Sequence, residues 1–149
     1  MTIKEALYQS CSAFLENRLI TVRNTILDIQ TSLQSETKSS AGDKHETGRA
    51  MLQLEREKAG CQLAEIEKQQ HILQNIDIGT KPSKVGYGSV VKTTQFNYFI
   101  AISAGEITIN NTSYFAISSA TPIAQLLLSK QIGDEVVFRA QKFKIVEII

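Results

Sequence analysis

The feature that most constrains this chain is a matched pair of apolar patterns on either side of a polar segment, residues 39–48. Before that segment, apolar residues recur at alternating steps of four and three, the spacing of a coiled-coil seam: Leu15, Leu19, Val22, Ile26, Ile29 and Leu33. After it, a compatible series follows, with Arg56 and Gln70 as polar interruptions: Leu52, Ala59, Leu63, Ile66 and Leu73. If the chain folds back at Gly42-Asp43, the two series fall opposite one another. The sequence therefore predicts one antiparallel helical hairpin with a polar, partly acidic tip.

The length of this hairpin is informative about its use. At a rise of 1.5 Å per residue, an arm from Ile3 to Leu33 would be roughly 45 Å long. So long a hairpin buries little of itself against its own domain. We therefore expect it to reach into a partner.

The second half of the chain has a different pattern of apolar and polar residues. Helical periodicity stops at about residues 77–84, where Gly and Pro appear, so we predict a hairpin over 1–78, a linker at 77–84 and a second domain over 85–149. Short β-rich runs follow, at 89–92, 97–102, 106–109, 113–117, 135–139 and 142–148. One helix interrupts them, with Thr121 as N-cap and Pro122 at its first position. The predicted class is α+β, a helical hairpin followed by a small antiparallel sheet with one short helix.

Composition argues against several functions. The net charge is +1, so overall basicity does not indicate nucleic acid. The two histidines lack Cys or Ser partners at motif spacing, and neither a phosphate-binding loop nor a paired-cysteine metal site is evident. We therefore expect no catalytic residue and no tightly bound cofactor. Cys11 and Cys61 lie near apolar faces but too far apart to pair, which predicts two buried free thiols in a cytosolic protein. No apolar run reaches the roughly 18 residues that span a membrane.

The residues at the hairpin tip that could carry chemistry are Asp43 and Glu46. An Asp-x-x-Glu sequence at the start of a helix is most simply a capping box, which we favour from the spacing alone. The functional interpretation is that two carboxylates at the end of a long probe offer oxygen ligands to a hard cation such as Mg²⁺. Lys44, His45 and Arg49 surround the pair and are most simply balancing surface charges.

Three segments of the second half resemble the FKBP-like domain of bacterial Gre-type transcription elongation (transcript-cleavage) factors. They match that family's Gly-Ser-x-Val opening, its Ser-Pro-(Leu/Ile)-Gly-x-Ala-Leu-Leu helix and its Val-Gly-Asp-x-Val turn: Gly88–Val91, Thr121–Leu127 and Ile132–Val136. Thr replaces Ser and Ala replaces Gly in the second. At the tip, Gly42-Asp43-x-x-Glu46 stands where the family has Gly-Asp-x-x-Glu-Asn-Ala-Glu-Tyr.

This resemblance implies a mechanism in which bacterial RNA polymerase does the chemistry. The C-terminal domain would bind at the rim of the polymerase secondary channel and the hairpin would enter it. Asp43 and Glu46 would help to hold the second Mg²⁺ of the polymerase active site, shared with the enzyme, where a backtracked RNA is cleaved. Contact with the RNA 3′ end and DNA would be indirect. The implied docking surface contains Ser119, Thr121, Pro122 and Ile123, in a cytoplasmic monomer.

The departures from the family leave other functions open. Thr47-Gly48-Arg49 replaces Asn-Ala-Glu, which removes an acid and adds a base near the tip carboxylates. A first alternative is therefore a secondary-channel regulator that does not stimulate cleavage. A second is an FKBP-type prolyl isomerase, which the absence of Trp disfavours. A third is an adaptor that dimerises through apolar residues outside the seam, with Tyr8, Phe14 and Ile20 as candidates.

Overall fold

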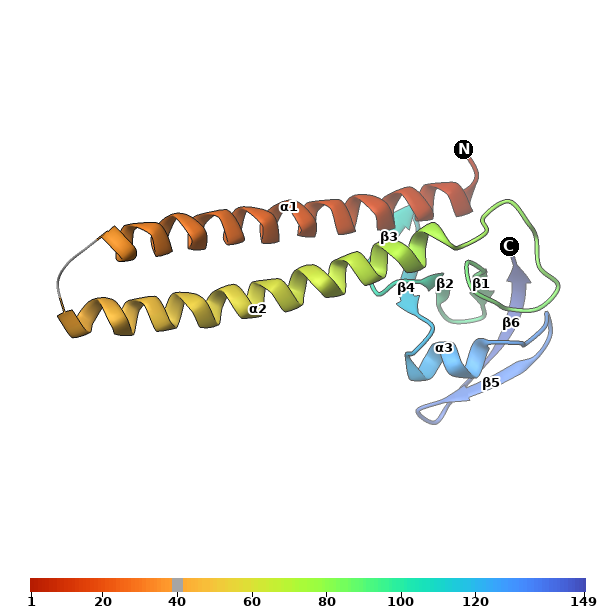
Figure 1. Cartoon of the computed structure of the whole chain (residues 1–149). Coiled ribbons are helices and arrows are strands. Elements are labelled where there is room, and N and C mark those ends of the chain that lie inside the picture. The colour runs from red at the N-terminus through yellow and green to blue at the C-terminus, as the bar shows by residue number, and fades with distance from the viewer. Residues whose placement is uncertain (39–41) are drawn as a thin grey trace. The chain divides into compact units, whose positions relative to one another are not determined.

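The computed structural model describes the backbone of residues 1–38 and 42–149, and the side chains of all residues except 36–45 (Figure 1). The chain divides into two compact units. One comprises Met1–Phe14 together with His71–Ile149, and the other comprises Leu15–Gln70. The beginning of the first long helix and the end of the second thus group with the sheet. Whether a hairpin over 1–78 and a domain over 85–149 fold separately stays a prediction.

The unit Leu15–Gln70 consists of parts of two long helices, α1 (Ile3–Lys38) and α2 (Gly42–Gln74), which run antiparallel (Figure 1). Nine of the eleven predicted seam residues form one apolar cluster, with buried members and half-buried neighbours: Leu19, Val22, Ile26, Ile29, Leu33, Leu52, Ala59, Leu63 and Ile66. The other two, Leu15 and Leu73, are also buried. The two helices bury a narrow stripe each and leave their other faces to solvent, as a coiled-coil seam requires. This confirms the predicted hairpin.

The two cysteines differ from each other in environment. Cys11 is fully buried on α1, and burial raises the pKa of its thiol to about 12. Cys61 is exposed, so the expectation of two buried thiols is wrong for this residue. The reason is helical geometry, because Cys61 follows the seam residue Ala59 by two positions, or about 200° around α2. Both thiols are free, as expected.

The other unit is built on a six-stranded sheet with the order β3-β4-β2-β1-β6-β5. The strands are β1 (Val90–Thr93), β2 (Asn97–Ala101), β3 (Gly105–Ile109), β4 (Thr112–Ser118), β5 (Glu135–Phe138) and β6 (Gln141–Ile148). One short helix, α3 (Pro122–Leu127), lies between β4 and β5 in sequence. The fold class is therefore the predicted α+β arrangement of a helical hairpin and a small, mostly antiparallel sheet.

One strand pair departs from the antiparallel prediction. β2 and β4 are parallel, with Tyr98 opposite Phe115 and Ile100 opposite Ile117. The cause is that β3 and β4 form a tight hairpin through Asn110 and Asn111, both with positive φ, and β4 rather than β3 then pairs with β2. The connection from β2 to β3 is consequently a loop rather than a hairpin turn.

The core of this unit places α3 against the sheet. The helix contributes Ile123 and Leu127 to a buried cluster whose other members come from the strands and the segment before β1: Val85, Val91, Ile100, Val136, Phe143, Ile145 and Ile148. Gly88, in the loop before β1, has φ +84°, and a Cβ there would collide with the Cγ2 methyl of Ile76. Its N–H donates to the Ile100 carbonyl oxygen at 2.6 Å. Only glycine allows this close approach of the loop to the residues that follow α2.

Candidate functional site

The first candidate site is the segment that joins the two long helices. α1 ends at Lys38 and α2 begins at Gly42, so Asp43 and Glu46 belong to the first turns of α2. The side chain of Asp43, and with it the predicted capping interaction, lies outside the described residues. The side chain of Glu46 is exposed. Carboxylates at the first turns of a helix are favoured by the partial positive charge of the helix N-terminus.

Whether this segment can bind a cation depends on the oxygen ligands that its side chains offer. Glu46 offers a solvent-exposed carboxylate, which is the kind of oxygen donor that Mg²⁺ prefers. Within the part of the chain that the structure describes, no three His, Cys, Asp or Glu residues gather into a metal-binding group. Arg49, also exposed, follows Glu46 by three residues, close to one helical turn. The described donors therefore fit an ion only if a partner completes its coordination.

The second candidate site is the beginning of α3. Thr121 is the N-cap, with φ −68° and ψ 149°. Its Oγ1 accepts a hydrogen bond from the Ala124 N–H at 3.3 Å and donates to the Ser118 carbonyl oxygen at 2.8 Å. Pro122 occupies the first helical position, where a missing N–H costs nothing. The predicted N-cap and first position are both confirmed.

The four residues predicted to dock a partner differ in exposure. Pro122 is exposed, and Ser119 and Thr121 are half-buried. Ile123 is only 9% exposed and belongs to the core, so it can support the surface but offers little area to a partner. The face of α3 opposite the core carries Leu126, which is 39% exposed. The helical period could have identified Leu126, because Ile123, Ala124 and Leu127 form the buried face.

A polar cluster joins the first turn of α1 to the segment after α2. The Lys4 ammonium is buried and donates to the Thr80 carbonyl oxygen at 2.9 Å. The Asp77 carboxylate accepts from the Gly79 N–H at 2.8 Å and from the Thr80 hydroxyl. Burial lowers the pKa of Lys4, against the opposing effect of the Asp77 charge. The pKa of Asp77 is lowered chiefly by the hydrogen bonds from Thr80 and Gly79, and less by the charge of Lys4.

This cluster predicts an acid-sensitive contribution to stability. Because the folded-state pKa of Asp77 lies below its unfolded value of about 3.9, the ionised carboxylate stabilises the fold above that pH. The contribution is lost as pH falls through the folded pKa. We expect Asp77→Asn to lower the melting temperature at neutral pH, and the gap to wild type to narrow as the pH falls below about 3.9, the unfolded value. Thermal melts at several pH values measure this gap in melting temperature. Glu57→Gln, a change at an exposed carboxylate, is the control. A gap that is constant with pH would contradict the assignment.

Comparisons with known proteins come from solved structures. No protein-family model and no curated protein matches the chain. A solved structure described as "Structure of the transcription factor Gfh1" aligns over 90% of this chain and 90% of that chain, with 21% identity and a TM-score of 0.35. None of the helices in the described ranges is both long and apolar enough to cross a membrane.

Proposed function

We propose that this chain is a Gre-type transcription elongation factor that binds bacterial RNA polymerase and stimulates cleavage of backtracked RNA by the polymerase active site. In this proposal the hairpin enters the secondary channel and the α3 side of the sheet docks at its rim. The observation that carries it is the antiparallel hairpin, whose second helix begins with Gly42-Asp43-x-x-Glu46. The three family-like segments of the sheet unit support it.

The architecture of the hairpin suits entry into a narrow channel. α1 has 36 residues and α2 has 33, which correspond to about 54 Å and 50 Å of helix. Between Leu15 and Gln70 the apolar cluster between the helices is a single seam. Two helices held together by one seam form a thin rod, about twice the 10–12 Å diameter of a single helix across. A rod of that width with carboxylates at its turn can deliver them to a recessed site.

The chemistry belongs to the polymerase in this proposal, and the chain contributes ligands. Asp43 and Glu46 would help to hold the second Mg²⁺, which would supply Lewis-acid chemistry for two-metal phosphodiester cleavage. The factor itself then needs no nucleophile, general base or cofactor of its own. The hairpin would present its carboxylates to the ion.

A second function, a channel regulator that does not stimulate cleavage, is favoured by one observation. Arg49 is exposed at a spacing from Glu46 close to one helical turn, where the Gre pattern has an acid. A guanidinium so close to the tip carboxylates opposes the binding of a cation by charge repulsion. Such a factor would occupy the channel and leave cleavage unstimulated.

A transcript-cleavage assay on halted elongation complexes tests both functions. We expect purified protein to bind core polymerase and to shorten the 3′ end of a backtracked RNA faster than polymerase alone does. Binding without faster cleavage would favour the regulator. An absence of binding would overturn the docking that both functions share.

The docking surface gives a further prediction. We expect Leu126→Asp to weaken binding to polymerase by about tenfold or more, because it places a charge in the exposed apolar face of α3 that would become buried. Leu126 lies outside the Thr121 cap and the buried face, so the fold should persist. Val137→Asp, on the 60% exposed Val137 of β5, is the matched control. Co-purification and circular dichroism of both variants provide the measurement, and equal binding by the two variants would remove α3 from the interface.

A further inference from the structure

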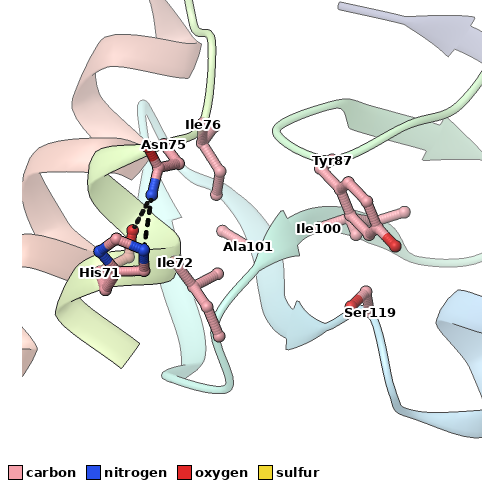
Figure 2. A pocket seen from close by; sticks show the side chains of 8 residues that line it. All are labelled: His71, Ile72, Asn75, Ile76, Tyr87, Ile100, Ala101 and Ser119. Atoms are coloured by element: carbon pink, nitrogen blue, oxygen red, sulfur yellow. Dashed lines mark hydrogen bonds between the residues drawn. The ribbon is translucent and has the colours of Figure 1, made fainter. Parts of the chain in front are cut away.

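A cavity of about 290 Å³ lies within the sheet-containing unit, apart from the tip (Figure 2). Four segments that are distant in sequence line it: the end of α2 with the residues after it, the loop before β1, the end of β2 and the loop after β4. Ile100 and Ala101 are buried, whereas Ile72 and Tyr87 are 41% and 69% exposed. The cavity therefore has a buried apolar base and an accessible rim.

The chemistry of the lining restricts what can bind. Among the described residues that line the cavity there is no Asp, Glu, Lys or Arg, so no fixed charge is available to balance an ion. Ile72, Ile76, Ile100 and Ala101 supply apolar contact. A charged ligand would lose hydration there without compensation, whereas a neutral apolar body would be stabilised.

The polar side chains that line the cavity differ in whether they already make hydrogen bonds. The Asn75 amide lies 3.2 Å from His71 Nε2 and donates to the His71 carbonyl oxygen at 2.9 Å, so its NH₂ group is used by the last turn of α2 (Figure 2). The hydroxyls of Tyr87 and Ser119 have no hydrogen-bond partner in the described part of the chain. Figure 2 shows these two residues across the cavity from Ile72 and Ile76. They can give or accept a hydrogen bond at one side of a ligand.

We propose that this cavity binds a small neutral aromatic molecule of one or two rings that carries one hydrogen-bonding group. The volume is at the low end of ligand sites, which suits a molecule of this size. Its rings would lie on Ile72, Ile100 and Ala101, beside the Tyr87 ring. Its polar group would meet the hydroxyl of Ser119 or Tyr87. The cavity shares Ser119 with the predicted docking surface, but binding of the small molecule does not require polymerase and is measured on the chain alone.

Indole is a suitable probe, because it is neutral, has two fused rings and carries one N–H donor. We expect a titration of the ¹⁵N-labelled full chain to shift the amide signals of Ile72, Tyr87, Ala101 and Ser119. The shifts should saturate together, with a dissociation constant of about 1 mM or tighter. Shifts that are scattered over both units, or that do not saturate, would overturn the proposal.

Substitutions at the cavity test whether indole binds there. We expect Ile72→Trp, which fills the cavity from its exposed rim, to weaken indole binding about tenfold or more, and Ser119→Ala to weaken it about threefold to tenfold. Val137→Trp places the same large side chain on an exposed position of β5 and should leave binding unchanged. The amide spectra show whether each variant is folded. Equal affinity in wild type and Ile72→Trp would overturn the assignment of the site. Absence of indole binding would do so as well, and would leave the cavity as a place for an apolar side chain of a partner protein.

Discussion

Asp43→Asn and Glu46→Gln are each expected to abolish stimulated transcript cleavage, to less than about one tenth of the wild-type rate, while binding to polymerase persists. An amide keeps the size and much of the capping capacity of a carboxylate but loses the charge that attracts Mg²⁺. The proposed docking surface is on another part of the chain, so affinity for the polymerase should not follow activity. Cleavage of a backtracked RNA and co-purification with polymerase, measured on the same preparations, separate the two effects.

A purely structural role for these carboxylates predicts a different outcome. Loss of a cap costs about 1 kcal/mol of stability, and activity would then follow the folded fraction. If wild type cleaves well and both amide variants are equally active, the proposed metal contact is wrong. Arg49→Glu should be measured beside the two amide variants, because it restores an acid where the Gre pattern has one. Activity that appears only in Arg49→Glu would identify the natural protein as the non-cleaving regulator.

Local patterns were enough to predict most of the fold. The alternation of four and three along α1 and α2 predicts a seam, and the structure places nine of those eleven residues in one cluster. The helix at Pro122–Leu127 follows from a Thr cap and a Pro at the first position, both visible in sequence. Strand β4 begins immediately after Asn110-Asn111, which adopt the positive φ values that Asn tolerates. In each case a few residues that are close together in sequence determine the local structure.

Long-range contacts account for what the sequence could not predict. The parallel pairing of β2 with β4 depends on which strand lies beside β2, and an apolar strand pattern is the same in either direction. The cavity is assembled from four segments, and Tyr87 or Ser119 alone gives no sign of it. At the predicted docking surface, the resemblance suggested Ile123, which the structure places in the core, whereas the spacing of the buried α3 residues already points to Leu126 as the exposed one.

The hairpin seam should be the most sensitive part of the unit Leu15–Gln70. Ile66 is fully buried in the seam cluster, which also contains Leu19. We expect Ile66→Ala to lower the free energy of unfolding by about 2–5 kcal/mol, because it removes buried methyl and methylene groups and leaves a cavity between two helices. Urea unfolding followed by circular dichroism, which reports mainly helix here, provides the measurement.

Leu54→Ala is the matched control, since Leu54 is on the same helix but 65% exposed. Its substitution should change stability by no more than about 0.5 kcal/mol. A double-mutant cycle with Leu19→Ala then tests the register, because side chains in contact couple by about 0.5–3 kcal/mol and distant ones add. Equal costs for Ile66→Ala and Leu54→Ala would mean that the two helices do not meet along this seam. The proposed delivery of Asp43 and Glu46 by a rigid rod would then lose its structural basis, whatever the cleavage assay showed.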